Sequence, residues 1–222
     1  MNDMNTARAP QALPKPTFID LLLEKKKLII GILLIIAVTV GGVLFWMQKT
    51  KADEQQASLA LSKVVPWIET GDSVKAVKGL KEIIAGYSGT PSGNMSRLYL
   101  ATIYYTMNRP DEALPLYNAF TSPTKDLQAS ALAGAASCNV QKKAFTAAAE
   151  GFEKASATAE NESLKAMYLN KAAESYIAAG KPNQAVKLFD QIIKSWPATS
   201  SAAVAQRTMW RLSGQGVQVV TP

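Results

Sequence analysis

The chain contains no histidine and a single cysteine, Cys138, among its 222 residues. Without histidine it can form neither a Ser-His or Cys-His nucleophile pair nor a histidine-ligated zinc site. One cysteine cannot form an internal disulfide or a cysteine cluster. Cys138 lies in the small, apolar stretch ALAGAASCNV, which is typical of a thiol packed in a core rather than a reactive one.

Other signals of catalysis are missing as well. The Gly-rich stretch GTPSG at residues 89–93 is not followed by the Lys-Ser/Thr pair of a phosphate-binding loop. The sequence shows no metal-ligand spacing and no pair of carboxylates set in an apolar stretch. We therefore predict that the protein is not an enzyme, with no catalytic residue, no metal site, no cofactor and no small-molecule substrate.

The net charge gives little reason to expect a nucleic-acid partner. Residues 1–51 hold seven of the 24 basic and three of the 17 acidic residues, which leaves 17 basic against 14 acidic residues in the remainder. That remainder has no dense Lys/Arg patch interleaved with aromatic residues. The basic character of the chain is partly a property of its first 51 residues, and we predict no nucleic-acid binding.

A long apolar run is the clearest feature that the sequence does contain. Residues 28–47 read LIIGILLIIAVTVGGVLFWM, twenty residues without a charge. As a helix rising about 1.5 Å per residue, this run matches a hydrocarbon core of roughly 30 Å. It is longer than the apolar region of a cleaved signal peptide, about 7–15 residues, and QKTKADEQQ follows it instead of a small-residue cleavage site. We predict one uncleaved transmembrane helix over residues 28–47.

The charges beside this run predict its orientation. Lys25, Lys26 and Lys27 come directly before it, and Trp46 at its end would lie in the opposite interface. Five basic residues precede the run and three follow it within about twenty residues, which favours a cytoplasmic N-terminus by the positive-inside rule. We expect a cytoplasmic tail over residues 1–27, a single pass through a bacterial inner membrane and a periplasmic C-terminal domain.

The rest of the chain reads as all-α. Apolar residues recur at helical spacing, alternating strand patterns are scarce, and turn signals cut the sequence into helices of about a dozen residues. We expect a helical domain over residues 48–213 and a flexible tail over residues 214–222.

Four segments of this domain share one pattern. A turn residue is followed five positions later by alanine and four positions after that by a large apolar residue, and the alanines are spaced 37, 35 and 37 residues apart. The four sets are Gly71, Ala76 and Leu80; Asn108, Ala113 and Tyr117; Lys143, Ala148 and Phe152; and Gly180, Ala185 and Phe189.

This pattern resembles the tetratricopeptide repeat, a 34-residue helix pair with small residues where the helices cross and an aromatic residue on the second helix. The last copy fits best, with Ala173 and Tyr176 before its turn. The resemblance implies an all-α solenoid with repeats at about 57–90, 94–127, 129–162 and 166–199, then a capping helix. The Trp and Gly of the ideal first helix are absent from most copies, so a generic alanine-rich solenoid is the alternative fold.

A solenoid of this kind binds along the concave face formed by the first helix of each pair. The register places the following residues there: Leu61, Val65, Ile68, Met95, Leu98, Thr102, Tyr105, Asn170, Glu174 and Ile177. None is Lys or Arg, so the carboxylate clamp of repeat domains that hold acidic chaperone C-termini is not expected. An apolar groove suits an amphipathic helix or a loosely folded polypeptide. The alternative for any one of these side chains is that it belongs to the core.

The order of parts resembles the YfgM-type family of ancillary Sec translocon subunits over residues 18–213: a short basic tail, an anchor, and degenerate helix pairs. The resemblance implies protein partners, namely translocon subunits, periplasmic chaperones or client polypeptides, which an anchored module would hold at high effective concentration. Two alternatives stay open. One is a scaffold for another envelope machine, such as cytochrome maturation, a pilus or cell division. The other is an organelle import receptor, against which the Lys25, Lys26 and Lys27 cluster and the missing clamp both argue.

Overall fold

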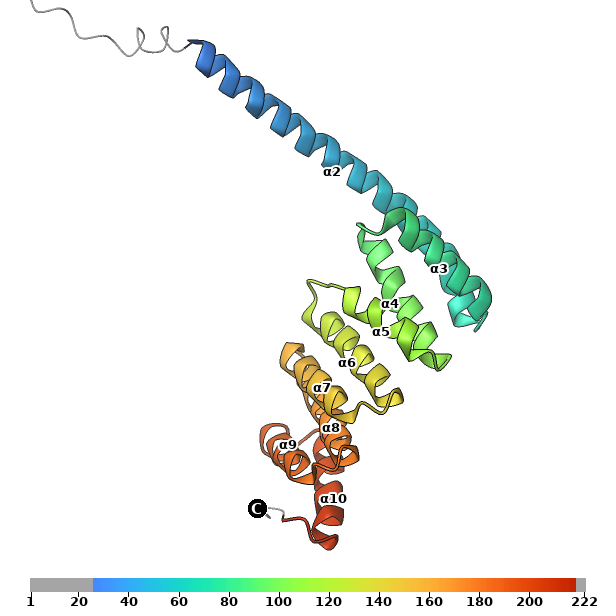
Figure 1. Ribbon diagram of the computed structural model, residues 1–222, viewed down its shortest axis with the longest axis vertical. Coiled ribbons are helices and arrows are strands. Elements are labelled where there is room, and N and C mark those ends of the chain that lie inside the picture. The colour runs from blue at the N-terminus through green and yellow to red at the C-terminus, as the bar shows by residue number, and fades with distance from the viewer. Residues whose placement is uncertain (1–25, 219–222) are drawn as a thin grey trace, which may run out of the picture. The chain divides into compact units, whose positions relative to one another are not determined.

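The computed structural model describes residues 26–218, without the side chains of residues 26–29, 31–33, 35–37 and 44. All regular structure in this range is helical (Figure 1), which confirms the predicted all-α class for the described part. The helices are α2 (Lys26–Glu69), α3 (Ser73–Tyr87), α4 (Pro91–Thr106), α5 (Pro110–Ala119), α6 (Lys125–Gln141), α7 (Phe145–Thr158), α8 (Glu162–Ala178), α9 (Pro182–Ser195) and α10 (Ser200–Gly214).

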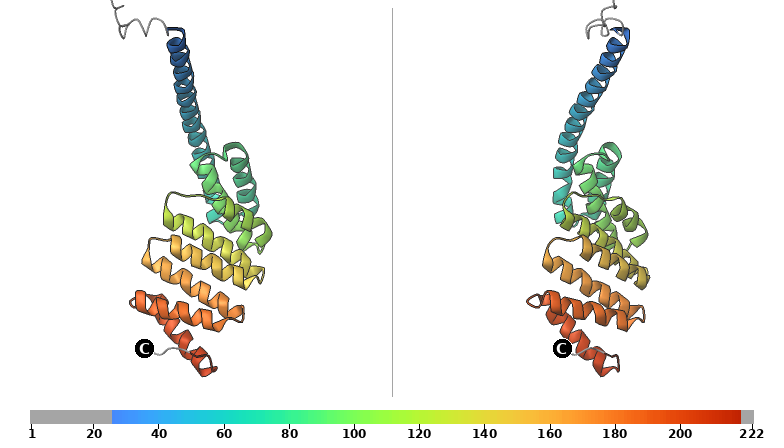
Figure 2. Two further views of the ribbon diagram at one scale, coloured as in Figure 1. Left: turned by 60° about the vertical axis from the view of Figure 1, so that its left-hand side comes forward. Right: turned by 90° about the vertical axis from the view of Figure 1, so that its left-hand side faces the viewer.

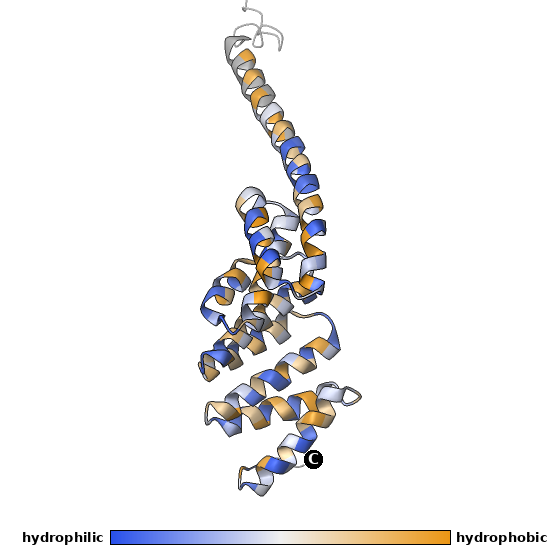
Figure 3. Cartoon of the chain, turned by 90° about the vertical axis from the view of Figure 1, so that its right-hand side faces the viewer, coloured by the Kyte–Doolittle hydropathy of each residue, from blue (hydrophilic) through white to orange (hydrophobic). Residues whose placement is uncertain are grey.

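The chain divides into two units, Met1–Lys49 and Thr50–Pro222. The described part of the first unit is the beginning of α2, where the side chains of Val38 and Phe45 are exposed. Figure 3 shows mostly apolar residues along this part of the helix and polar residues farther along it.

Among the described residues, no helix is long and apolar enough to cross a membrane. Nine of the twenty side chains of the predicted span, and those of Lys26 and Lys27, lie outside the described ones, as does the whole of Lys25. The transmembrane helix over residues 28–47 and its lysine flank therefore stay predictions.

The second unit consists of helical hairpins stacked one after another (Figure 2). The C-terminal part of α2 pairs with α3, α4 with α5, α6 with α7, and α8 with α9, and α10 follows the last pair. The first helices α4, α6 and α8 contact one another in turn, whereas no such contact joins the described second helices α3, α5, α7 and α9. The first helices therefore lie on the inner side of the stack, where the sequence placed the concave face.

The turn inside each pair has the same backbone geometry. Gly71, Asn108, Lys143 and Gly180 all have positive φ, between 56° and 75°. At the last three turns, the next residue's N–H donates to the carbonyl five residues before it, as from Lys181 to Tyr176 at 2.8 Å. This is the Schellman arrangement, which satisfies the carbonyl groups left over at a helix end.

The aligned alanines lie where the repeat pattern predicts small residues. Ala76, Ala113, Ala148 and Ala185 are all fully buried. The large residues four positions later, Leu80, Tyr117, Phe152 and Phe189, are buried in the same repeated way. The register read from the sequence is therefore the register of the packing.

Helix α6 packs against its neighbours on two faces, and the side chains that it buries there are small. Ala131, Ala135 and Cys138 belong to the core shared with α4 and α5, whereas Ala133 and Ala136 belong to the core shared with α7. Burial raises the pKa of the Cys138 thiol to about 11, so the thiol stays protonated at neutral pH. This agrees with the interpretation of Cys138 as a packed side chain.

The capping helix covers the end of the stack, as an open end would expose apolar core. Thr199 caps α10 by accepting the Ala202 N–H at 3.2 Å. The structure describes the chain as far as residue 218, five residues past the predicted domain boundary at residue 213. Val217 is half-buried against the C-terminal core, and its N–H donates to the Leu212 carbonyl at 3.1 Å. An apolar residue at this position commonly accompanies a Schellman turn, here with Gly216 at φ +83°.

Candidate functional site

The predicted concave residues lie on the first helices α2, α4 and α8. Two of them are exposed, namely Thr102 and Glu174. Seven are half-buried, namely Leu61, Val65, Ile68, Met95, Leu98, Tyr105 and Ile177. Of these, Leu61, Ile68, Leu98 and Tyr105 pack against the N-terminal core.

Asn170 is the predicted residue that the structure removes from the accessible surface. It is buried, and its Nδ2 donates to the Ser201 carbonyl of α10 at 2.8 Å. Its Oδ1 has no hydrogen-bond partner among the described residues. Asn170 therefore joins α8 to the capping helix instead of facing a ligand.

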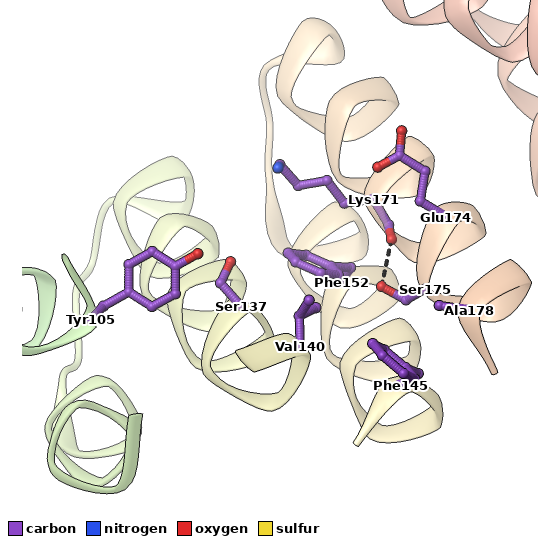
Figure 4. A pocket seen from close by; sticks show the side chains of 9 residues that line it. All are labelled: Tyr105, Ser137, Val140, Phe145, Phe152, Lys171, Glu174, Ser175 and Ala178. Atoms are coloured by element: carbon purple, nitrogen blue, oxygen red, sulfur yellow. Dashed lines mark hydrogen bonds between the residues drawn. The ribbon is translucent and has the colours of Figure 1, made fainter. Parts of the chain in front are cut away.

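The inner surface also contains residues that the sequence argument omitted. Adding the 35-residue spacing to Thr102 and Tyr105 gives Ser137 and Val140 on α6. Both line a cavity of about 190 Å³ between the helix pairs (Figure 4). Its lining comes from α4, α6, α7 and α8: Tyr105, Ser137, Val140, Phe145, Phe152, Lys171, Glu174, Ser175 and Ala178.

The wall of this cavity is mainly apolar. In Figure 4, Tyr105 lies at one side, Val140 stands in the middle, and Phe145 and Phe152 of α7 lie at the other side. The position of Tyr105 is fixed from α6, because the Gln141 Nε2 donates to the Tyr105 carbonyl at 3.1 Å. Two of the predicted residues, Tyr105 and Glu174, are thus brought together with aromatic residues from a second helix, which the first-helix register does not reveal.

One edge of the cavity carries charge. Lys171 and Glu174 lie three residues apart on α8, and neither forms an ion pair with another described residue. The Lys171 Nζ lies 5.9 Å from the centre of the Phe152 ring, within the range of a cation–π contact. Ser175 is buried, and its Oγ donates to the Lys171 carbonyl at 2.7 Å. The edge therefore offers one unpaired cation and one unpaired anion beside an apolar wall.

The other predicted residues do not join this cavity. Met95 lines a separate hollow of about 520 Å³ at the α3–α4 and α5–α6 connections. Leu61, Val65 and Ile68 line neither of these two hollows. Within the described residues, no group of three or more Cys, Asp or Glu side chains is placed to hold a metal ion.

Comparison with solved structures places the fold among tetratricopeptide solenoids. The crystal structure of MamA is 20% identical, with a TM-score of 0.50, and the match covers 64% of this chain and 82% of that one. The crystal structure of a Podosopora anserina putative kinesin light chain with nearly identical TPR-like repeats is 19% identical, with a TM-score of 0.55, and the match covers 69% and 83%. At these identities the likeness shows the fold alone.

Sequence comparison gives the family. No curated protein matches the chain in sequence. A family model described as a tetratricopeptide repeat matches residues 170–199, the segment in which the sequence pattern is clearest. A second model, described as a tetratricopeptide repeat-like domain, matches residues 23–135, which is just over half of the chain. The chain therefore belongs to the tetratricopeptide repeat-like domain family.

Proposed function

We propose that this protein is a membrane-anchored module of the bacterial inner membrane that holds polypeptides on the inner surface of its solenoid. Tetratricopeptide repeats serve protein–protein interaction, so the chain carries a protein-interaction module. The observation that supports a polypeptide ligand here is the cavity formed by Tyr105, Val140, Phe145 and Phe152 with unpaired charges at its edge.

The size of the cavity argues for one anchoring side chain. Small-molecule sites usually enclose about 300–1,000 Å³, whereas this cavity holds about 190 Å³. An aromatic or large aliphatic side chain would fill it, and the bound backbone would continue along α4, α6 and α8. Lys171 and Glu174 are exposed, so an ion pair with the ligand would contribute only about 0.2–1 kcal/mol and would act mainly on ligand choice.

The predicted membrane anchor would place the binding surface on the periplasmic side of the inner membrane. The uncharged run at residues 28–47 and the lysines before it favour a cytoplasmic N-terminus and a periplasmic solenoid. Together with the order of parts, this supports a role ancillary to the Sec translocon, linking it to periplasmic chaperones or client polypeptides. Tethering would let a weak binder act at the exit of the channel by raising its effective concentration.

A photoreactive amino acid in place of Val140 tests the binding surface in native membranes. We expect crosslinks to translocon subunits, chaperones or translocating polypeptides. A matched probe at Lys154, which is exposed on α7, should give few crosslinks. Equal yields of the same products from both positions would overturn the assignment of the inner surface.

A reporter fusion tests the anchor independently. Alkaline phosphatase joined after Pro222 should be active in a bacterial host, because it folds only outside the cytoplasm. Activity of a cytoplasmic reporter at the same position would overturn the proposed topology and leave the binding surface to be judged by the crosslinks.

A further inference from the structure

Each first helix after α2 uses the same three positions to contact the preceding pair. The nine side chains at these positions are all buried. They are Ser96, Leu100 and Ile103 of α4, Ala131, Ala135 and Cys138 of α6, and Tyr168, Ala172 and Ser175 of α8. Small or apolar residues fill them because a neighbouring helix covers them.

The equivalent positions of α2 are uncovered. Subtracting the 37-residue spacing from the α4 positions gives Leu59, Lys63 and Pro66, and all three are exposed. The Leu59 side chain is 60% exposed, although it is a large apolar residue. The second unit therefore presents, at its first pair, the kind of face that its later pairs cover. We name these three residues, together with Trp67 and Glu82, the open face.

The open face is hollowed. A cavity of about 410 Å³ lies between α2 and α3, lined among others by Leu59, Lys63, Trp67, Gly79 and Glu82. Gly79 forms part of its wall, and a Cβ atom there would lie 2.6 Å from Val64 Cγ2, so α2 and α3 approach closely behind the hollow. An exposed apolar side chain beside a preformed hollow is a surface that can interlock with another.

The charges of the open face match a second copy of the same face. Lys63 is on α2 and Glu82 is on α3; both line the hollow, and neither pairs with another described residue. A patch with one cation and one anion on opposite helices becomes complementary to itself after a two-fold rotation. We propose that two copies of this protein associate through their open faces, with Lys63 of each copy against Glu82 of the other and Leu59 in the interface.

Crosslinking of the full-length protein in its membrane tests this contact. In a Cys138→Ala background, Leu59→Cys treated with a short bis-maleimide should give a species of twice the 23.8 kDa chain mass. Lys154→Cys, on the exposed surface of α7, serves as the matched control and should give at least tenfold less of it. A Leu59→Cys product that contains a different protein, or no dimer, would overturn the proposal.

Charge reversal tests the two-fold arrangement. Lys63→Glu or Glu82→Lys alone should lower the Leu59→Cys dimer yield about tenfold, because each places like charges opposite one another. The double variant restores opposite charges in both contacts and should recover the yield to within twofold. Unchanged yield in the single variants, or no recovery in a double variant with unchanged helicity and melting temperature, would show that the faces do not pair in this way.

Discussion

Helices α6 and α9 occupy different places in the same stack and are built differently. Helix α9 buries one face, formed by Ala185, Val186, Phe189 and Ile192, and keeps its charged residues on the other. Helix α6 buries small residues on two faces, because helices pack on both of its sides. In α9 the large buried side chains belong to the helix itself, whereas around α6 they come from its partners, such as Tyr117 of α5 and Phe152 of α7.

Two glycines, Gly134 of α6 and Gly151 of α7, show how closely the neighbouring helices approach α6. A Cβ atom on Gly134 would lie 2.4 Å from Cε1 of Tyr117, and one on Gly151 would lie 2.9 Å from the Ala136 Cβ. The ring of Tyr117 from α5 thus occupies the space that a side chain of α6 would otherwise fill. The packing around α6 therefore requires small residues on α6, whereas the packing around α9 requires large side chains on α9.

Removing volume should harm α9 most. Phe189 has no exposed surface, and Phe189→Ala would leave a cavity and lower the free energy of unfolding by about 3–5 kcal/mol. Denaturant unfolding of the full-length protein measures the loss. Phe145→Ala is the control, because Phe145 is half-buried and lines the surface cavity, so its loss should be clearly smaller. Equal losses would contradict the packing described for α9.

Adding volume should harm α6 more than α9. Ala136→Leu and Ala185→Leu both overpack a buried site, at a cost of about 1–3 kcal/mol each. We expect Ala136→Leu near the upper end, because α6 is held from both sides, and Ala185→Leu near the lower end, because α9 can move toward solvent. The two denaturation midpoints measure the difference. An unchanged midpoint for Ala185→Leu would mean that the repeat register is wrong.

Helix α6 also carries a carboxylate, Asp126, whose contact should depend on pH. The Asp126 Oδ1 accepts the backbone N–H groups of Glu160 at 2.7 Å and Asn161 at 3.1 Å, which joins α6 to the α7–α8 connection. These N–H groups stabilise the charged carboxylate and lower the pKa of Asp126. The contact therefore adds stability above the unfolded-state pKa of about 3.9 and loses it as the pH falls toward the lower folded-state pKa.

Asp126→Asn tests this contact, since its side chain does not ionise. The denaturation midpoints of wild type and variant should differ most near neutral pH and converge as the pH falls below about 4. Midpoints that converge toward neutral pH, or that differ equally at every pH, would show that the carboxylate is not stabilised by these N–H groups.

The contrast between α6 and α9 also explains which parts of the fold could be predicted from the sequence. The apolar period of α9 and its Pro182 at the first helical position mark a surface helix plainly. Helix α6 has no dominant apolar face, so it is found only by counting from the alanines of the other copies. The four aligned alanines lie on the second helices, so Ala185 marks α9 directly, and α6 follows only as the helix before the one that carries Ala148.

The candidate site was predictable to the extent that it follows the register. Tyr105 and Glu174 were found on the first helices, and Ser137 and Val140 follow from the same spacing. Phe145 and Phe152 belong to a second helix, and Lys171 falls between register positions, so only the packing of α7 on α8 brings them to the cavity. Asn170 satisfies the register but is covered by α10, a contact outside the repeat pattern.

The smallest expected effect concerns the turns that follow α6 and α8. Lys143 and Gly180 hold the same position with φ of 59° and 73°, but only glycine adopts this conformation without a steric penalty. The left-handed backbone conformation costs a residue with a side chain roughly 1–2 kcal/mol, and glycine avoids this cost. Glycine also loses more conformational entropy on folding, which cancels part of the stability gained by the substitution. We expect Lys143→Gly to raise the free energy of unfolding by about 0.5–1 kcal/mol and Gly180→Lys to lower it by a similar amount. Paired denaturation curves would measure both. A loss of stability in Lys143→Gly would mean that the lysine side chain contributes more to the α6–α7 turn than its backbone strain removes.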